Sequence, residues 1–80
     1  MQFDTTNYPL NIRDYIAPLT PGESLKAYRM REIFTQVQLA KKSGILQQHI
    51  SEMENGKRTI GKKNAVKLAE ILNCDYRHFL

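Results

Sequence analysis

The chain has 80 residues, of which 41% are hydrophobic and 25% are charged. This length accommodates one domain with a modest core, and this composition excludes a chain that is disordered throughout. No apolar run approaches the roughly 18 residues that a membrane span requires, and no secretory leader follows Met1. We therefore expect a cytoplasmic protein without a membrane partner.

The formal net charge of +4 is unevenly distributed along the chain. Residues 1–23 carry one cation against three acids, whereas residues 24–80 carry eleven Lys and Arg residues against five acids. Five of these cations lie between Lys57 and Lys67, where the sequence contains no acid. A basic cluster at one place indicates a polyanionic partner more specifically than a basic total does.

Residues 1–22 are expected to form a partly ordered N-terminal arm. This segment contains all three prolines and ends in Pro21-Gly22, a turn signal, and its apolar residues fit either an extended stretch or one helical turn. From residue 23 the apolar period is helical, so we expect a folded domain over 23–80. Its first helix should span 23–33, with Leu25, Tyr28 and Met30 turned inward.

A second helix is expected over 36–43, and a third follows after a tight turn. Thr35 is typical of an N-cap, because its hydroxyl can accept a hydrogen bond from a free backbone N–H of the next turn. The helix should bury Val37, Leu39 and Ala40. Gly44 then suits the left-handed conformation that often ends a helix.

The third helix should span 47–55 and end at Gly56, and the fourth should span 62–72. One face of the fourth helix is apolar and consists of Ala65, Leu68, Ala69 and Leu72. Asp75 is expected to cap a last short turn whose apolar residues are Tyr76, Phe79 and Leu80. The sequence therefore predicts an all-α domain of five helices. Cys74, the one cysteine, is expected to fill space in the core.

The third predicted helix has two chemically different faces. Its polar residues lie within an arc of about 140° at 100° per residue, and they are Gln47, Gln48, Ser51, Glu52 and Asn55. Ile50 and Met53 lie on the opposite side. A glutamine amide both donates and accepts hydrogen bonds, as the N6 and N7 edge of adenine requires in the major groove of DNA. A short helix, a glycine turn and a second helix with such a face are typical of a helix-turn-helix.

The sequence "TQVQLA" at 35–40, "GI" at 44–45 and "QQHISEMENGKR" at 47–58 resemble the DNA-binding domain of Cro/cI-type (Xre-family) repressors. The resemblance extends over residues 25–79 and implies a role for each matching residue. Gln36 would bond a phosphate and brace Gln47. The base contacts would come from Gln47, Gln48, Ser51 and Glu52, and further backbone contacts from Asn55 and Lys57. Arg29 and Glu54 match a pair that locks the first helix onto the third.

Two residues depart from the pattern of this family. Leu46 stands where Ser, Thr or Pro usually precedes the recognition helix, so a side-chain cap should be missing there. Ile33 stands where a glycine commonly ends the first helix. Because a β-branched residue resists positive φ, we expect this turn to be built differently.

Lys62 and Lys63 fall in the first turn of the fourth predicted helix, where the helix dipole disfavours each cation by about 0.3–1 kcal/mol. A phosphate bound at the free N–H groups of this turn would offset that cost. We therefore expect backbone contacts from Lys57, Arg58, Lys62 and Lys63. The alternative is a basic surface that serves solubility alone.

An enzyme is not expected. The two histidines, His49 and His78, are 29 positions apart, and the sequence contains no metal-ligand spacing, no nucleophile–base arrangement and no Gly-rich phosphate loop. We accordingly expect no metal and no cofactor.

The function expected from these features is sequence-specific binding of double-stranded DNA by a transcriptional repressor that regulates its own expression. A homodimer is expected, with its interface on the last two helices, where Tyr76, Phe79 and Leu80 are apolar candidates, or on the arm. The alternative is an antitoxin of the HigA type or another protein-binding module, whose main partner would be a protein such as a toxin.

Overall fold

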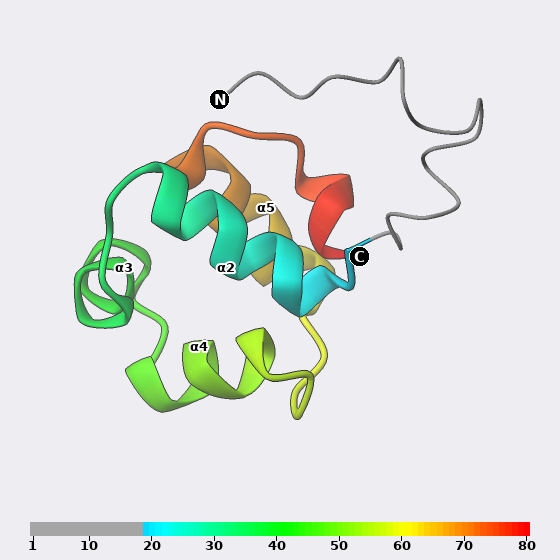
Figure 1. Cartoon of the computed structure of the whole chain (residues 1–80), viewed down its shortest axis with the longest axis horizontal. Coiled ribbons are helices and arrows are strands. Elements are labelled where there is room, and N and C mark those ends of the chain that lie inside the picture. The colour runs from blue at the N-terminus through cyan, green and yellow to red at the C-terminus, as the bar shows by residue number, and fades with distance from the viewer. Residues whose placement is uncertain (1–18) are drawn as a thin grey trace, which may run out of the picture.

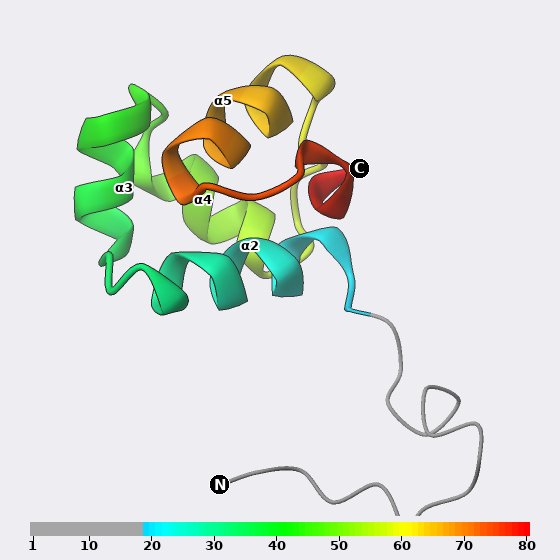
Figure 2. The same ribbon diagram turned by 90° about the horizontal axis from the view of Figure 1, so that it is seen from above.

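The computed structural model describes residues 19–80, and every regular element in this range is a helix (Figures 1 and 2). The elements are α2 (Pro21–Arg31), α3 (Gln36–Ser43), α4 (Gln47–Glu54), α5 (Lys62–Leu72) and the 3-10 helix η1 (Tyr76–Phe79). The all-α prediction is confirmed. Most of the predicted arm, residues 1–18, lies outside the described residues.

The prediction of five α-helices is wrong, because residues 76–79 form the 3-10 helix η1. Its backbone bonds span three residues: His78 N–H donates to Asp75 O at 3.2 Å, and Leu80 N–H donates to Arg77 O at 3.3 Å. The carboxylate of Asp75 caps this single turn by accepting from the Arg77 N–H at 2.9 Å. A segment of four residues suits the tighter 3-10 winding, which is used in short pieces.

Helix α2 begins at Pro21, two residues before the predicted start. Thr20 Oγ1 accepts from the Glu23 N–H at 3.1 Å, and Glu23 Oε1 accepts from the Thr20 N–H at 3.0 Å. This capping box makes Pro21 the first helical residue, where its missing N–H costs nothing, so the predicted Pro-Gly turn is wrong. Gly22 is buried, and a Cβ at this position would collide with the carbonyl oxygen of Met53 at the end of α4.

The core lies where all five helices meet. Its buried apolar residues are Leu25, Leu39, Ile45, Ile50, Met53, Ile60, Ala65, Leu68, Ala69, Leu72 and Phe79. They include the four residues predicted on the apolar face of α5. Cys74 is half-buried against this cluster, and burial raises the pKa of its thiol.

Two residues predicted to face inward are exposed. Val37 is 45% exposed and Met30 is 59% exposed. Val37 and Leu39 are about 160° apart on a helical wheel, so a helix that buries Leu39 turns Val37 outward. Met30 is likewise about 140° from Leu25, which is fully buried.

Helices α3 and α4 are consecutive, are packed against each other and are joined by residues 44–46. Helix α3 lies at one end of the helical domain, where it also packs against α5 (Figure 2). Helix α2 packs against α4 and η1. Because α4 packs against both α2 and α3, the face of α4 that points away from these two helices is open to a partner.

Candidate nucleic-acid interface

The two faces predicted for the recognition helix are present on α4. Ile50 is fully buried and Met53 is 2% exposed, whereas Gln47 and Gln48 are exposed. Within residues 19–80 neither glutamine side chain has a hydrogen-bond partner. Their amides are therefore free to donate and accept at an external surface.

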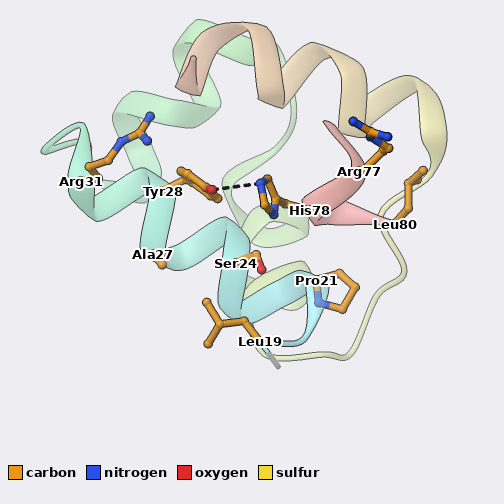
Figure 3. A pocket seen from close by; sticks show the side chains of 9 residues that line it. All are labelled: Leu19, Pro21, Ser24, Ala27, Tyr28, Arg31, Arg77, His78 and Leu80. Carbon is orange, nitrogen blue, oxygen red and sulfur yellow. Dashed lines mark hydrogen bonds between the residues drawn. The ribbon is translucent and has the colours of Figure 1, made fainter. Parts of the chain in front are cut away.

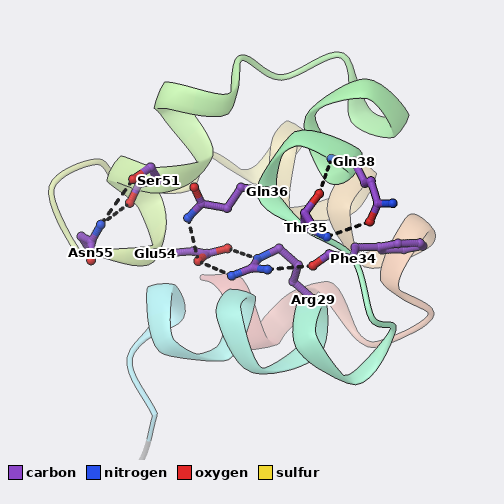
Figure 4. Close-up of polar contacts among 8 residues, drawn as sticks. All are labelled: Arg29, Phe34, Thr35, Gln36, Gln38, Ser51, Glu54 and Asn55. Carbon is purple, nitrogen blue, oxygen red and sulfur yellow. Dashed lines mark hydrogen bonds and ion pairs between the residues drawn. The ribbon is translucent and has the colours of Figure 1, made fainter.

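Three further polar residues of this face are connected to neighbours. Asn55 Nδ2 donates to Ser51 O at 2.8 Å and lies 3.4 Å from Ser51 Oγ (Figure 4). Glu52 Oε1 lies 3.3 Å from Arg58 Nε. This exposed pair partly offsets the charge of Glu52, so Arg58 would compete with a base for this carboxylate.

Helix α4 begins without a side-chain cap, because Leu46 occupies the N-cap position. The side chain of Leu46 is exposed. By contrast, Thr35 and Gln38 form a capping box at the start of α3, with bonds of 3.0 and 2.9 Å. Gly44 ends α3 with a φ of 73°. The predicted cap at Thr35, the left-handed turn at Gly44 and the missing cap at Leu46 are all confirmed.

Arg29 and Glu54 form a bidentate ion pair between α2 and α4 (Figure 4). Arg29 Nε donates to Glu54 Oε2 at 2.6 Å, and Arg29 Nη2 donates to Glu54 Oε1 at 3.0 Å. The third donor, Arg29 Nη1, reaches the carbonyl oxygen of Phe34 at 2.7 Å, just before α3. The side chains of Arg29 and Glu54 are 11% and 3% exposed, so water screens this pair little.

Gln36, the first residue of α3, is also connected to this pair. Its Nε2 donates to Glu54 Oε1 at 3.1 Å. The role implied for Gln36 was to brace Gln47, but within residues 19–80 its hydrogen bond goes to Glu54. This bond leaves no signal in the sequence, because the two residues are 18 positions apart and no local pattern connects them.

The basic cluster lies directly after α4 and continues into α5. Lys57, Lys62 and Lys63 are exposed, and within residues 19–80 none of the three forms an ion pair. Helix α5 begins at Lys62, and its N-cap Gly61 supplies no side-chain hydrogen bond. The first N–H groups of α5 are thus uncapped by side chains and carry two cations beside them, which suits a phosphate oxygen.

A groove of about 560 Å³ lies between α2 and η1 (Figure 3). Tyr28 Oη and His78 Nε2 are 3.1 Å apart there, and the Arg31 guanidinium stacks 4.7 Å from the Tyr28 ring centre. None of the predicted DNA-contacting residues lines this groove.

Within residues 19–80, no group of three His, Cys, Asp or Glu side chains could hold a metal ion. No helix in this range is long and apolar enough to cross a membrane.

Comparison with known proteins identifies the family of the chain. A model of the helix-turn-helix family matches residues 25–79. The structure is also similar to the crystal structure of the restriction-modification controller protein C.AhdI from Aeromonas hydrophila, with a TM-score of 0.69 and 28% sequence identity. That match covers 75% of this chain and 91% of the other. No curated protein matches the sequence. The chain therefore belongs to the Xre (Cro/cI-type) helix-turn-helix family of DNA-binding transcription regulators.

Proposed function

We propose that this protein is a sequence-specific repressor that places α4 in the major groove of double-stranded DNA. The observation that carries the proposal is the outer face of α4, where two exposed glutamines have no partner within residues 19–80 and the basic cluster follows directly. Exposed amides without partners can read base edges, and the adjacent cations can bind phosphates.

The proposed contacts fall into two groups. The base contacts come from Gln47, Gln48, Ser51 and Glu52. The backbone contacts come from Gln36, Asn55, Lys57, Arg58, Lys62 and Lys63. Arg58 serves both groups, because its movement from Glu52 to a phosphate would free the carboxylate to accept from a cytosine N4.

A homodimer is part of this proposal, since two recognition helices would read half-sites about one turn of DNA apart. Leu80 is 57% exposed and Val66, on α5, is 37% exposed, so both are available to a second copy. Phe79, predicted as a dimer contact, is 1% exposed and belongs to the core of its own chain. The surface therefore centres on α5 and the end of η1.

The alternative is an antitoxin or another protein-binding module. The similarity to a controller protein supports a regulator whose main partner is DNA, and the unpartnered face of α4 supports the same choice. An antitoxin can bind both its toxin and DNA. The discovery of a toxin partner would therefore not decide between the two proposals.

Selection of bound sequences from random duplex DNA tests the proposed function. We expect enrichment of a site with two related half-sites about 10 base pairs apart, because each copy contributes one α4. A variant with Gln47→Ala and Gln48→Ala serves as the control and should lose most of the enrichment. A bound pool that remains as random as the input would contradict sequence-specific binding.

A further inference from the structure

Gln36 connects the buried ion pair to the surface that would face DNA. Glu54 accepts from Arg29 through both carboxylate oxygens, and Oε1 also accepts from Gln36 Nε2 at 3.1 Å. The side chain of Glu54 is 3% exposed, whereas Gln36 is only half-buried. A single hydrogen bond thus links the packed interior to the first residue of α3.

This bond selects one of the two orientations of the Gln36 amide. A carboxylate accepts hydrogen bonds and donates none, whereas the two ends of an amide are similar in shape and opposite in function. Reversing the amide would bring its oxygen against Glu54 Oε1, and two acceptors cannot bond. With the nitrogen facing Glu54, the carbonyl oxygen is directed away from the ion pair (Figure 4).

We propose that Glu54 is a positioning residue for DNA recognition and acts through Gln36. This inference rests on the proposed function. Because its orientation is fixed, the carbonyl oxygen of Gln36 stays free to accept from Gln47 when DNA is bound, and one N–H of Gln36 stays free for a phosphate. An amide that turned freely would present the wrong end part of the time, and its ordering would cost binding free energy. Arg29 contributes by holding the Glu54 carboxylate at two points.

A double-mutant cycle tests this role with two duplexes: the most enriched sequence selected by the wild-type protein and a shuffled duplex of the same composition. Selectivity is the ratio of the two dissociation constants. Glu54→Gln keeps the shape of the side chain but allows the neighbouring amide to face either way. Gln36→Met removes the amide and keeps the length. Glu32→Gln, in a partly exposed pair with Arg31 at the end of α2 and outside the proposed DNA and dimer surfaces, is the matched control for the loss of one negative charge.

Glu54→Gln and Gln36→Met should each lower selectivity about tenfold, the effect of about one hydrogen bond, and Glu32→Gln should not. The double variant should be no less selective than Gln36→Met alone, because Glu54 acts through Gln36. Two results would overturn the inference. One is a folded Glu54→Gln protein whose selectivity is unchanged. The other is a Glu54→Gln change that lowers selectivity as much in the Gln36→Met protein as in the wild type. A wild-type protein that does not distinguish the two duplexes would instead refute the proposed function.

A measurement on the wild-type protein avoids the question of whether Glu54→Gln folds. The two protons on Gln36 Nε2 give separate nuclear magnetic resonance signals. One of them should exchange slowly with water because it is bonded to the buried Glu54, and the other should exchange fast. Equally fast exchange of both protons would show that the amide is not held and would overturn the inference.

Discussion

Ile33 adopts a backbone conformation that its side chain resists. Its φ is 59°, in the left-handed region, and its side chain is 86% exposed. The expectation that this turn avoids positive φ is therefore wrong. The turn is held by bonds from the Ile33 N–H to Met30 O at 3.0 Å and from the Phe34 N–H to Arg29 O at 3.1 Å. The end of α2 thus imposes the geometry that a glycine usually provides.

Ile33→Gly should raise the free energy of unfolding by about 0.5–1 kcal/mol, as measured by urea denaturation. The left-handed region costs an L-residue roughly 1–2 kcal/mol, and part of the gain is offset by the greater freedom of glycine in the unfolded chain. Gly44→Ala is the matched control, since Gly44 has a φ of 73° and a Cβ added there would meet no atom within 4 Å. It should change stability in the opposite direction. A destabilising Ile33→Gly would contradict the assigned conformation.

At the scale of the elements, the helix starts are of two kinds. Helices α2 and α3 begin with capping boxes, whereas α4 and α5 begin without a side-chain cap. At the capped starts, side chains of the protein accept hydrogen bonds from free backbone N–H groups. The uncapped starts belong to α4, the proposed recognition helix, and to α5, which carries Lys62 and Lys63. Free N–H groups are therefore concentrated where phosphate oxygens would bind.

The cap of η1 should make the stability of the fold depend on pH. Hydrogen bonds from the Arg77 side chain, and then from its backbone N–H, lower the pKa of Asp75 to about 2. Because this folded-state pKa is depressed, the carboxylate stabilises the fold at higher pH and loses its effect as the pH falls towards 2. Asp75→Asn should therefore lower the melting temperature at pH 7 but not near pH 2. An unchanged difference across this range would contradict the charged cap.

Breaking the ion pair between α2 and α4 should strongly destabilise the fold. Glu54→Ala leaves the Arg29 guanidinium buried without its partner, so we expect a loss of up to about 3–5 kcal/mol in the free energy of unfolding. Arg29→Met combined with Glu54→Leu should be milder, because no charge remains buried. Chemical denaturation measures both. A Glu54→Ala protein as stable as the wild type would contradict the importance of the pair.

The parts of the fold that could be predicted depend on neighbours in sequence. Thr35 was identified as a cap because its partner, Gln38, is three residues away. Thr20 and Glu23 have the same spacing, but the Pro21-Gly22 pair between them is typical of a turn. The capping box at Thr20 was therefore not predicted. The bond from Gln36 to Glu54 and the conformation of Ile33 depend on packing between helices, so no local pattern could reveal them.

At the scale of the whole molecule, the basic cluster should make DNA binding strongly dependent on salt. Each neutralised phosphate releases condensed counterions, so Lys57→Ala or Lys62→Ala should flatten the slope of log K against log salt by about one unit. Both variants should weaken specific and random DNA alike. Lys26→Ala, an exposed residue on α2 outside the proposed contacts, is the control. A slope unchanged in both variants would remove these lysines from the interface.

The central claim is that α4 reads bases, and a titration of Gln48→Ala tests it most directly. The selected duplex and a random duplex are each titrated with the wild-type protein and with the variant. If the Gln48 amide contacts one adenine in each half-site, the variant should lose about 1–3 kcal/mol of binding free energy on the selected duplex and relax the choice of one base pair. Affinity for the random duplex should stay the same, because phosphate contacts supply it. Full affinity and selectivity of Gln48→Ala for the selected duplex would contradict the account.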